Sequence, residues 1–299
     1  MKQTNQTTPS IIFPLVISII AISFAAIFVK WSSAPSTILS MYRMLMASAL
    51  LVPIVWKKRA EFQKLSRKDW LLLVCSGLFL ALHFALWFGS LKLTTVASST
   101  IILALQPLVA LIGGFLLYKE RVAGSTILMM MIAFVGVVMV GWGDITVGKM
   151  ALIGDVLSFL CVIAVVCYLL IGQNVVKKFS HWVYSFSVFL IAGLFLALYN
   201  VMAGIPLVDY PRKEWGIFFL LAIFPTLAHL IYNWLLNYVN STTISMTILG
   251  EPVGATILAA ILLKEQITEW QILGGLLVLL GVFFFLIKQR KRVKYKYEG

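Results

Sequence analysis

Two polar residues lie deep inside apolar stretches, and each is followed directly by proline. Gln106 stands in IILALQPLVALIGGFLLYKE, residues 101–120, and Glu251 stands in MTILGEPVGATILAAILLKE, residues 246–265. An ionisable group at membrane depth is costly to bury, so Glu251 is a candidate for binding a proton or the amine of a solute. The alternative is structural, because a polar side chain beside a proline can also hydrogen-bond between helices. Both roles stay open, and we expect the two residues to face one cavity.

A polar stripe recurs every four residues along the apolar segment 215–238. It consists of Pro225, His229, Asn233 and Asn237, with Tyr232 beside it. Residues four apart share one face of a helix, and lipid would penalise that face, so we expect it to point inward. His83 and Trp87, again four apart, form a smaller stripe. In this arrangement Asn and His can hold a carboxylate or an amine while the aromatic rings pack against a solute, although a lone buried His is often structural.

Arg43 is the one basic residue that lies well inside an apolar segment, 36–56. It can bind an anionic group of a solute or pair with an acid. Asp155, near the outer end of segment 151–173, is a candidate partner at comparable depth. A structural pairing is the favoured interpretation of this arginine.

The elements that must position these residues are membrane-spanning helices. Of 299 residues, 61% are hydrophobic and only 12% are charged, about half the charged share of a soluble domain. A helix needs about 20 apolar residues to cross a bilayer, and the alternating ten-residue pattern of a β-barrel is missing. Hydropathy predicts ten spans, at 11–30, 36–56, 70–91, 95–118, 124–142, 151–173, 182–203, 215–238, 241–263 and 270–288. We read the first span as retained rather than as a secretory signal.

The charge distribution predicts the orientation. With the N-terminus inside, seventeen Lys and Arg residues fall on the cytoplasmic side and six on the other, which places both ends in the cytoplasm. The net charge of +13 comes mainly from one loop, 57–68, and from the tail. Basic residues that flank spans argue against nucleic acid as a partner. The three cysteines all fall in apolar spans, so no disulfide framework is predicted.

The two central stretches are 145 positions apart, close to half the chain. The same offset relates Trp70 to Trp215 and Gly136 to Gly281, and it relates the Lys-Glu pairs that end the two stretches. Five spans in each half is an odd number, so the halves must enter the membrane from opposite sides. We therefore predict an all-α membrane protein of ten transmembrane helices, built as two inverted five-helix repeats around a central cavity. Its parts are 1–145, 146–288 and a basic cytoplasmic tail, 289–299.

Along nearly its whole length the chain resembles the drug/metabolite transporter superfamily, in its ten-helix branch of paired EamA domains. The resemblance rests on YRMLMASALLVP around Arg43, on Lys30 at the end of the first span, on the two central stretches and on GDVLSF at 154–159. It implies a small-metabolite carrier of the cytoplasmic membrane, commonly an exporter of amino acids or related compounds, that works by alternating access. Four-helix relatives that expel cationic drugs exchange protons through a Glu in their first helix. Residues 11–31 contain no acid, so that scheme is not carried over.

The expected function is thus a secondary transporter, an exporter of small metabolites, with the lipid bilayer and a small solute as partners and a proton as a possible coupling ion. A multidrug or cationic-compound efflux carrier is the alternative, followed by a channel or a receptor. An enzyme is disfavoured: the chain has no HExxH motif, no second deep acid to pair with Glu251, and no histidine near the cysteines. It has no Walker loop of a primary pump. No cofactor, metal site or homo-oligomer is predicted.

Overall fold

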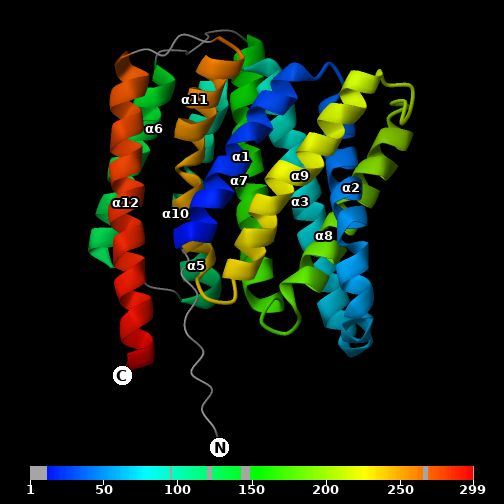
Figure 1. The fold of residues 1–299 in the computed structure, drawn as a ribbon, viewed down its shortest axis with the longest axis horizontal. Helices are drawn as coiled ribbons and strands as arrows, with labels where there is room; N and C mark the ends of the chain where they lie inside the picture. Colours follow the sequence, from blue (N-terminus) through cyan, green and yellow to red (C-terminus); the bar gives the residue numbers. More distant parts are fainter. Residues whose placement is uncertain (1–11, 95, 120–122, 143–148, 265–268, 299) are drawn as a thin grey trace, which may run out of the picture.

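The computed structural model describes residues 12–94, 96–119, 123–142, 149–264 and 269–298. In this part of the chain all regular structure is helical (Figure 1). The first-half elements are α1 (Ile12–Trp31), α2 (Ser36–Lys57), the short 3₁₀ helix η1 (Arg59–Lys64), α3 (Arg67–Leu93), α4 (Val96–Leu103), α5 (Gln106–Tyr118) and α6 (Gly124–Trp142). Those that follow are α7 (Lys149–Val175), α8 (His181–Met202), α9 (Arg212–Leu235), α10 (Ser241–Ile248), α11 (Glu251–Leu262) and α12 (Glu269–Glu298).

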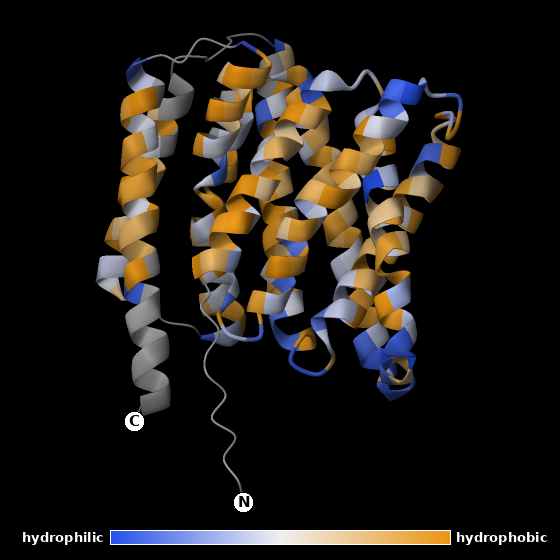
Figure 2. Cartoon of the chain, viewed as in Figure 1, coloured by the Kyte–Doolittle hydropathy of each residue, from blue (hydrophilic) through white to orange (hydrophobic). Residues whose placement is uncertain are grey.

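The protein is a multi-pass membrane protein. Among the described residues, seven segments are long and apolar enough to cross a bilayer. They are α1, α2, α3, Ile153–Val175 in α7, α8, α9 and the stretch Ser241–Leu262. Figure 2 shows hydrophobic residues along the middle of the bundle and hydrophilic residues at its two ends. The other three predicted spans contain shorter apolar helices, Gln106–Tyr118, Gly124–Gly136 and Ile272–Phe285, so ten spans remain a prediction.

The two central stretches are broken helices, which corrects the expectation of continuous spans at 95–118 and 241–263. Turns at Ala104–Leu105 and at Leu249–Gly250 interrupt them, 145 residues apart. The following helices, α5 and α11, begin at Gln106 and Glu251 and carry proline in their first turn. Proline fits there because that N–H has no partner within the helix. The polar–proline pairs therefore start helices instead of interrupting them.

The two broken helices also end alike. Lys119 closes α5 in the left-handed conformation, with φ of 53°, and Lys264 follows α11 with φ of 57°. Non-glycine residues seldom adopt this conformation except at helix ends. The acids that follow these lysines, Glu120 and Glu265, lie outside the described residues. The repeat found in the sequence thus extends to backbone geometry.

Helices pack mainly against helices from the other half of the chain. α5 lies beside α10 and α4 lies beside α11, so the two broken helices run antiparallel (Figure 1). In the same way α3 packs against α7 and α1 against α9, while α2 packs against α8. The remaining pair, α6 and α12, forms one edge of the bundle.

Two glycines let α6 and α12 approach closely. A Cβ atom at Gly136 would lie 2.5 Å from the backbone oxygen of Gly274, and one at Gly281 would lie 2.9 Å from the Cβ of Ala133. Small residues at such crossings are the usual way in which helices pack in a membrane. These are the glycines that the 145-residue offset relates.

An acid at the start of α3 and another at the start of α9 tie the halves together at opposite ends of the bundle. Asp69 accepts hydrogen bonds from Ser66, which caps α3, and pairs at 2.7 Å with Lys178 in the α7–α8 connection. Glu214 accepts hydrogen bonds from the Ser32 hydroxyl and from the Ser33 backbone and hydroxyl, both at 2.9 Å. Asp69 and Glu214 are again 145 positions apart. We call these contacts the Asp69 tie and the Glu214 tie.

Candidate functional site

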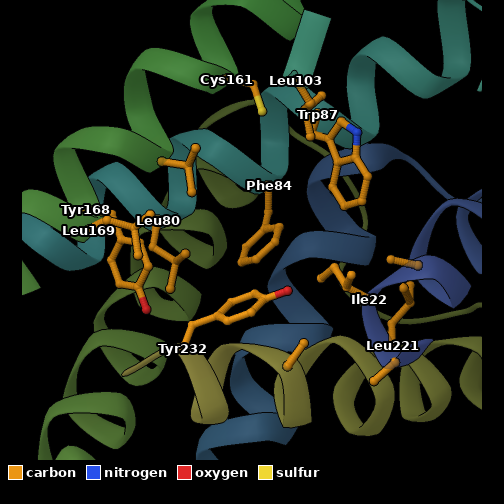
Figure 3. Packing of buried hydrophobic residues seen from close by; sticks show 14 of the residues in the cluster. Ile22, Leu80, Phe84, Trp87, Leu103, Cys161, Tyr168, Leu169, Leu221 and Tyr232 are labelled. Carbon is orange, nitrogen blue, oxygen red and sulfur yellow. The ribbon is translucent and has the colours of Figure 1, made fainter. Parts of the chain in front are cut away.

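A set of polar and aromatic side chains is buried where α2, α3, α7, α9 and α11 meet. We call it the central cluster: Arg43, His83, Phe84, Trp87, Cys161, Tyr168, His229, Tyr232, Asn233 and Glu251. Figure 3 shows Phe84 and Trp87 from α3 and Tyr232 from α9 turned into the same interior region as Tyr168 and Cys161 from α7. The sequence predicted an inward orientation for most of these residues.

Arg43 is fully buried, and its guanidinium carbon lies 3.6 Å from the centre of the Phe84 ring. Within the described part of the chain, its Nε and both Nη atoms have no hydrogen-bond partner. The guanidinium interacts electrostatically with Glu251 and with Tyr168. Among the described residues no ion pair joins the suggested partner Asp155 to Arg43.

Both histidine rings contact Phe84, the ring on which Arg43 packs. The ring centres of His83 and His229 are 6.4 Å apart, and His83 stacks on Trp87 at 6.1 Å. The Nδ1 atom of His83 is 3.0 Å from the Cys161 Sγ atom. This contact is contrary to the expectation from the sequence that the cysteines have no histidine nearby. The two residues are 78 positions apart, so local spacing gave no signal of it.

Asn233 occupies the centre of a hydrogen-bond network. The Tyr168 hydroxyl donates to its Oδ1 atom, and its Nδ2 atom donates to the Ser185 hydroxyl at 2.9 Å. The network thereby joins α7, α8 and α9. Both polar atoms of the amide therefore have a partner within the protein in this conformation.

Asn237 does not belong to this face, contrary to the predicted stripe. α9 ends at Leu235, so Asn237 lies in the turn that follows. Its side chain is exposed and donates to the Trp234 carbonyl at 3.0 Å. The four-residue spacing continued in the sequence after the helix had ended.

Glu251 faces a small pocket between the two helix breaks. The pocket has a cavity volume of about 10 Å³ and is lined by Thr100, Leu103, Ala104, Ile248, Leu249, Glu251 and Pro252. α4 and α10 end beside this pocket and α5 and α11 begin beside it, so helix carbonyl ends and helix N–H ends both meet there. Gln106 is buried nearby, but it donates to Ser245 on α10 at 3.3 Å and is not a lining residue.

The cluster contains three side chains that the sequence did not single out: Phe84, Cys161 and Tyr168. Cys161 and Tyr168 are seven positions apart, a spacing that places them on one helix face. That signal was available but weak in an apolar run. Phe84 carries no sequence signal, because its importance comes from Arg43 on another helix.

Chemically, the site offers two separate regions. In the pocket the Glu251 carboxyl suits a cationic or protonated group, whereas Arg43 presents only donors and suits an anion. Glu251 belongs to both, since it lines the pocket and interacts electrostatically with Arg43.

Comparison with known proteins gives a consistent result. The model of the EamA-like transporter family matches residues 9–142 and 152–287. An uncharacterized transporter of Archaeoglobus fulgidus is 25% identical over 261 residues, which cover 85% of this chain and 88% of the relative. The uncharacterized transporter YetK of Bacillus subtilis is 27% identical over 267 residues, covering 85% of this chain and 79% of YetK. The uncharacterized transporter sll1164 of Synechocystis is 28% identical over 252 residues, covering 79% and 71%.

A solved structure described as the crystal structure of a protein has the same fold. It superposes with a TM-score of 0.76 at 16% sequence identity, covering 92% of this chain and 96% of its own.

Proposed function

The chain belongs to the EamA-like transporter family, and on this premise we propose that it is a secondary transporter that exports small metabolites, such as amino acids or related compounds, across the cytoplasmic membrane. Transport proceeds by alternating access, in which the central cluster opens to one side of the membrane and then to the other.

One observation carries the proposal: two antiparallel broken helices meet at a pocket that contains a buried carboxyl group. Broken helices at the interface of inverted repeats are the usual site of substrate and coupling ion in secondary transporters. We assign the repeats to residues 1–145 and 146–288, with 289–299 as a cytoplasmic tail. The matching breaks, left-handed lysines and ties at the 145-residue offset support this division.

The cavity volume of about 10 Å³ has room for about one water molecule and is far below the roughly 300 Å³ at which pockets for small ligands begin. Cargo therefore requires the helices to separate. The Asp69 tie and the Glu214 tie are both formed, and they join the halves at the two ends. We infer that the described conformation is closed at both ends, between an inward-open and an outward-open form.

We assign roles to the candidate residues on this basis. Glu251 binds an amine or the coupling proton, and Arg43 binds a negative group. Trp87, Tyr232, His83 and His229 form the walls against which a side chain packs. Gln106, bonded to Ser245, and Asn233 hold the surrounding helices in place.

A carrier for cationic compounds is the second candidate. The Glu251 carboxyl in the pocket favours it, because a buried carboxylate suits a positive charge on a solute that carries no carboxylate of its own.

The test of the proposed function is counterflow in proteoliposomes that contain the full chain, with a panel of labelled amino acids and with labelled isoamylamine. We expect uptake of at least one amino acid, and at least a tenfold loss in Glu251→Gln. Glu269→Gln, at an exposed residue of α12, is the matched control and should transport normally. Uptake of the amine alone selects the cationic alternative, and no uptake of any compound contradicts a carrier of this class.

The orientation, with both termini in the cytoplasm, needs its own measurement. A cysteine replacing Gln63, in the exposed η1 segment, should resist an impermeant thiol reagent in intact cells. One replacing Val208, in the α8–α9 connection, should react. The opposite pattern reverses the orientation.

A further inference from the structure

Arg43 is the unexplained residue of the central cluster. A guanidinium has five N–H donors and no acceptor, and here all three nitrogens are buried without a hydrogen-bond partner in the described chain. One contact is a stacked one, on the Phe84 ring. Stacking leaves the donors at the edge of the guanidinium plane unused.

Other basic residues near the spans are satisfied in the ordinary way. Lys30 donates to the Thr94 carbonyl at 3.0 Å, and Lys92 donates to the Ser32 carbonyl. A structural arginine would be expected to do the same, because a buried charge without partners destabilises a fold. The chain instead keeps Arg43 with its donors unoccupied.

Glu251 is the acid that interacts electrostatically with Arg43, but it does not hydrogen-bond to the guanidinium. The two groups interact, yet no ion pair joins them among the described residues. Oε1 of Glu251 is also without a hydrogen-bond partner. Arg43 thus has unused hydrogen-bond donors and Glu251 has an unused acceptor, although the two groups interact electrostatically.

We infer that Arg43 anchors a carboxylate group of the transported solute, and that Glu251 is the internal carboxylate with which that group competes. A planar guanidinium binds a carboxylate through two parallel hydrogen bonds, and it does so while one of its faces remains stacked on an aromatic ring. When the site is empty, Glu251 balances the charge of Arg43. When solute enters, its carboxylate takes over that role and releases Glu251 for an amine or a proton.

This inference rests on the proposed function and narrows its substrate class to solutes that carry a carboxylate. It also predicts that Arg43 lowers, or leaves unchanged, the stability of the protein without bound solute. Replacing the arginine by methionine, of similar length and without charge, should leave the melting temperature of the empty protein at or above that of the wild type.

The experiment measures the thermal shift of the purified full chain in detergent with matched probes. The probes are L-leucine and L-phenylalanine, the primary amides of both, the deaminated acids isocaproate and hydrocinnamate, and isoamylamine. We expect an acid to raise the melting temperature and its amide to have no effect. Arg43→Lys should weaken the response to that acid about tenfold, since it keeps the charge but loses the paired geometry, and Arg43→Met should abolish it. In Glu251→Gln the deaminated acids should bind more tightly than in the wild type, because the competitor is neutral.

Equal shifts with acid and amide would overturn the inference, and so would the absence of a shift with every carboxylate. If Arg43→Met melts below the wild type while Arg43→Lys restores melting without changing any ligand response, Arg43 is structural and the inference is also overturned. None of these results bears on counterflow, which tests the proposed function separately. A carrier that passes that test with isoamylamine alone and ignores carboxylates would be the cationic alternative, still a carrier but without this anchor.

Discussion

At the scale of single residues, the central cluster contains two kinds of buried polar group. Asn233 has a partner for both of its polar atoms, whereas Arg43 has none for its three nitrogens within the described chain. The sequence predicted that both are buried, because each lies in an apolar span. It could not predict this difference, since the partners of Asn233 come from residues 48 and 65 positions away. The same holds for the contact between His83 and Cys161.

Asn233→Ala is expected to destabilise the protein by about 1–3 kcal/mol, because it leaves the Tyr168 and Ser185 hydroxyls buried with a lost partner. Asn237→Ala is the matched control, with an exposed side chain in the turn after α9, and should change stability by less than about 0.5 kcal/mol. Thermal unfolding in detergent measures both. Equal effects of the two substitutions would show that the network around Asn233 is not as described.

At the scale of elements, the sequence predicted where the helices lie better than where they begin and end. Its repeat located the two central stretches correctly, with their polar–proline pairs. It did not reveal the breaks at Ala104–Leu105 and Leu249–Gly250, because a proline in the first turn of a helix and a proline inside a helix look alike in an apolar stretch. Asn237 was misplaced for the related reason that nothing after Leu235 marks the helix end.

The close crossing of α6 and α12 gives an element-scale prediction. Gly136→Ala should destabilise the protein by about 1–3 kcal/mol, because the new methyl group would meet the backbone of α12 at Gly274. Gly216→Ala, in α9, is the control: a Cβ atom there would have no described neighbour within 4 Å, and alanine favours a helix by up to about 1 kcal/mol. Thermal unfolding should therefore move in opposite directions for the two variants. A neutral Gly136→Ala would mean that the two helices do not cross at this point.

At the scale of the whole molecule, the helices of the first half pair with those of the second, and the two ties hold the ends of the bundle. The sequence predicted two halves from the 145-residue offset. It did not predict the ties, because Ser32, Ser33 and Lys178 are ordinary loop residues until the fold brings them to Glu214 and Asp69. Nor could it show how tightly the centre is packed in this conformation.

The two ties predict that access to the centre can be opened from one membrane face at a time. This access can be measured at Cys161, the buried thiol beside His83. In protein with Cys161 as its single cysteine, Asp69→Asn should raise alkylation by an aqueous maleimide severalfold in inside-out vesicles. Glu214→Gln should do so in right-side-out vesicles. Each substitution weakens the contacts that hold one end of the bundle closed and leaves the other end intact.

The same vesicles with Glu269→Gln serve as the control, since this residue has no part in either tie and its neutralisation should leave alkylation unchanged. If both tie variants increase alkylation equally from both sides, the ties stabilise the fold as a whole and do not close separate ends. If neither variant changes the rate, the ties do not limit access to the centre.

The 145-residue offset gives this protein an internal control, because most positions in one half have a counterpart in the other. Residue pairs such as Asp69 and Glu214, Gly136 and Gly281, or Lys119 and Lys264 occupy corresponding positions of the two halves, at different places in one bundle. A substitution made at both members of a pair, one at a time, keeps the chemistry fixed and changes only the position. Any difference between the two variants then reports on asymmetry, and it needs neither a homologue nor a second protein for comparison. Gln106 and Glu251 are a pair in which the residue type itself differs, so the two halves are chemically different at this position.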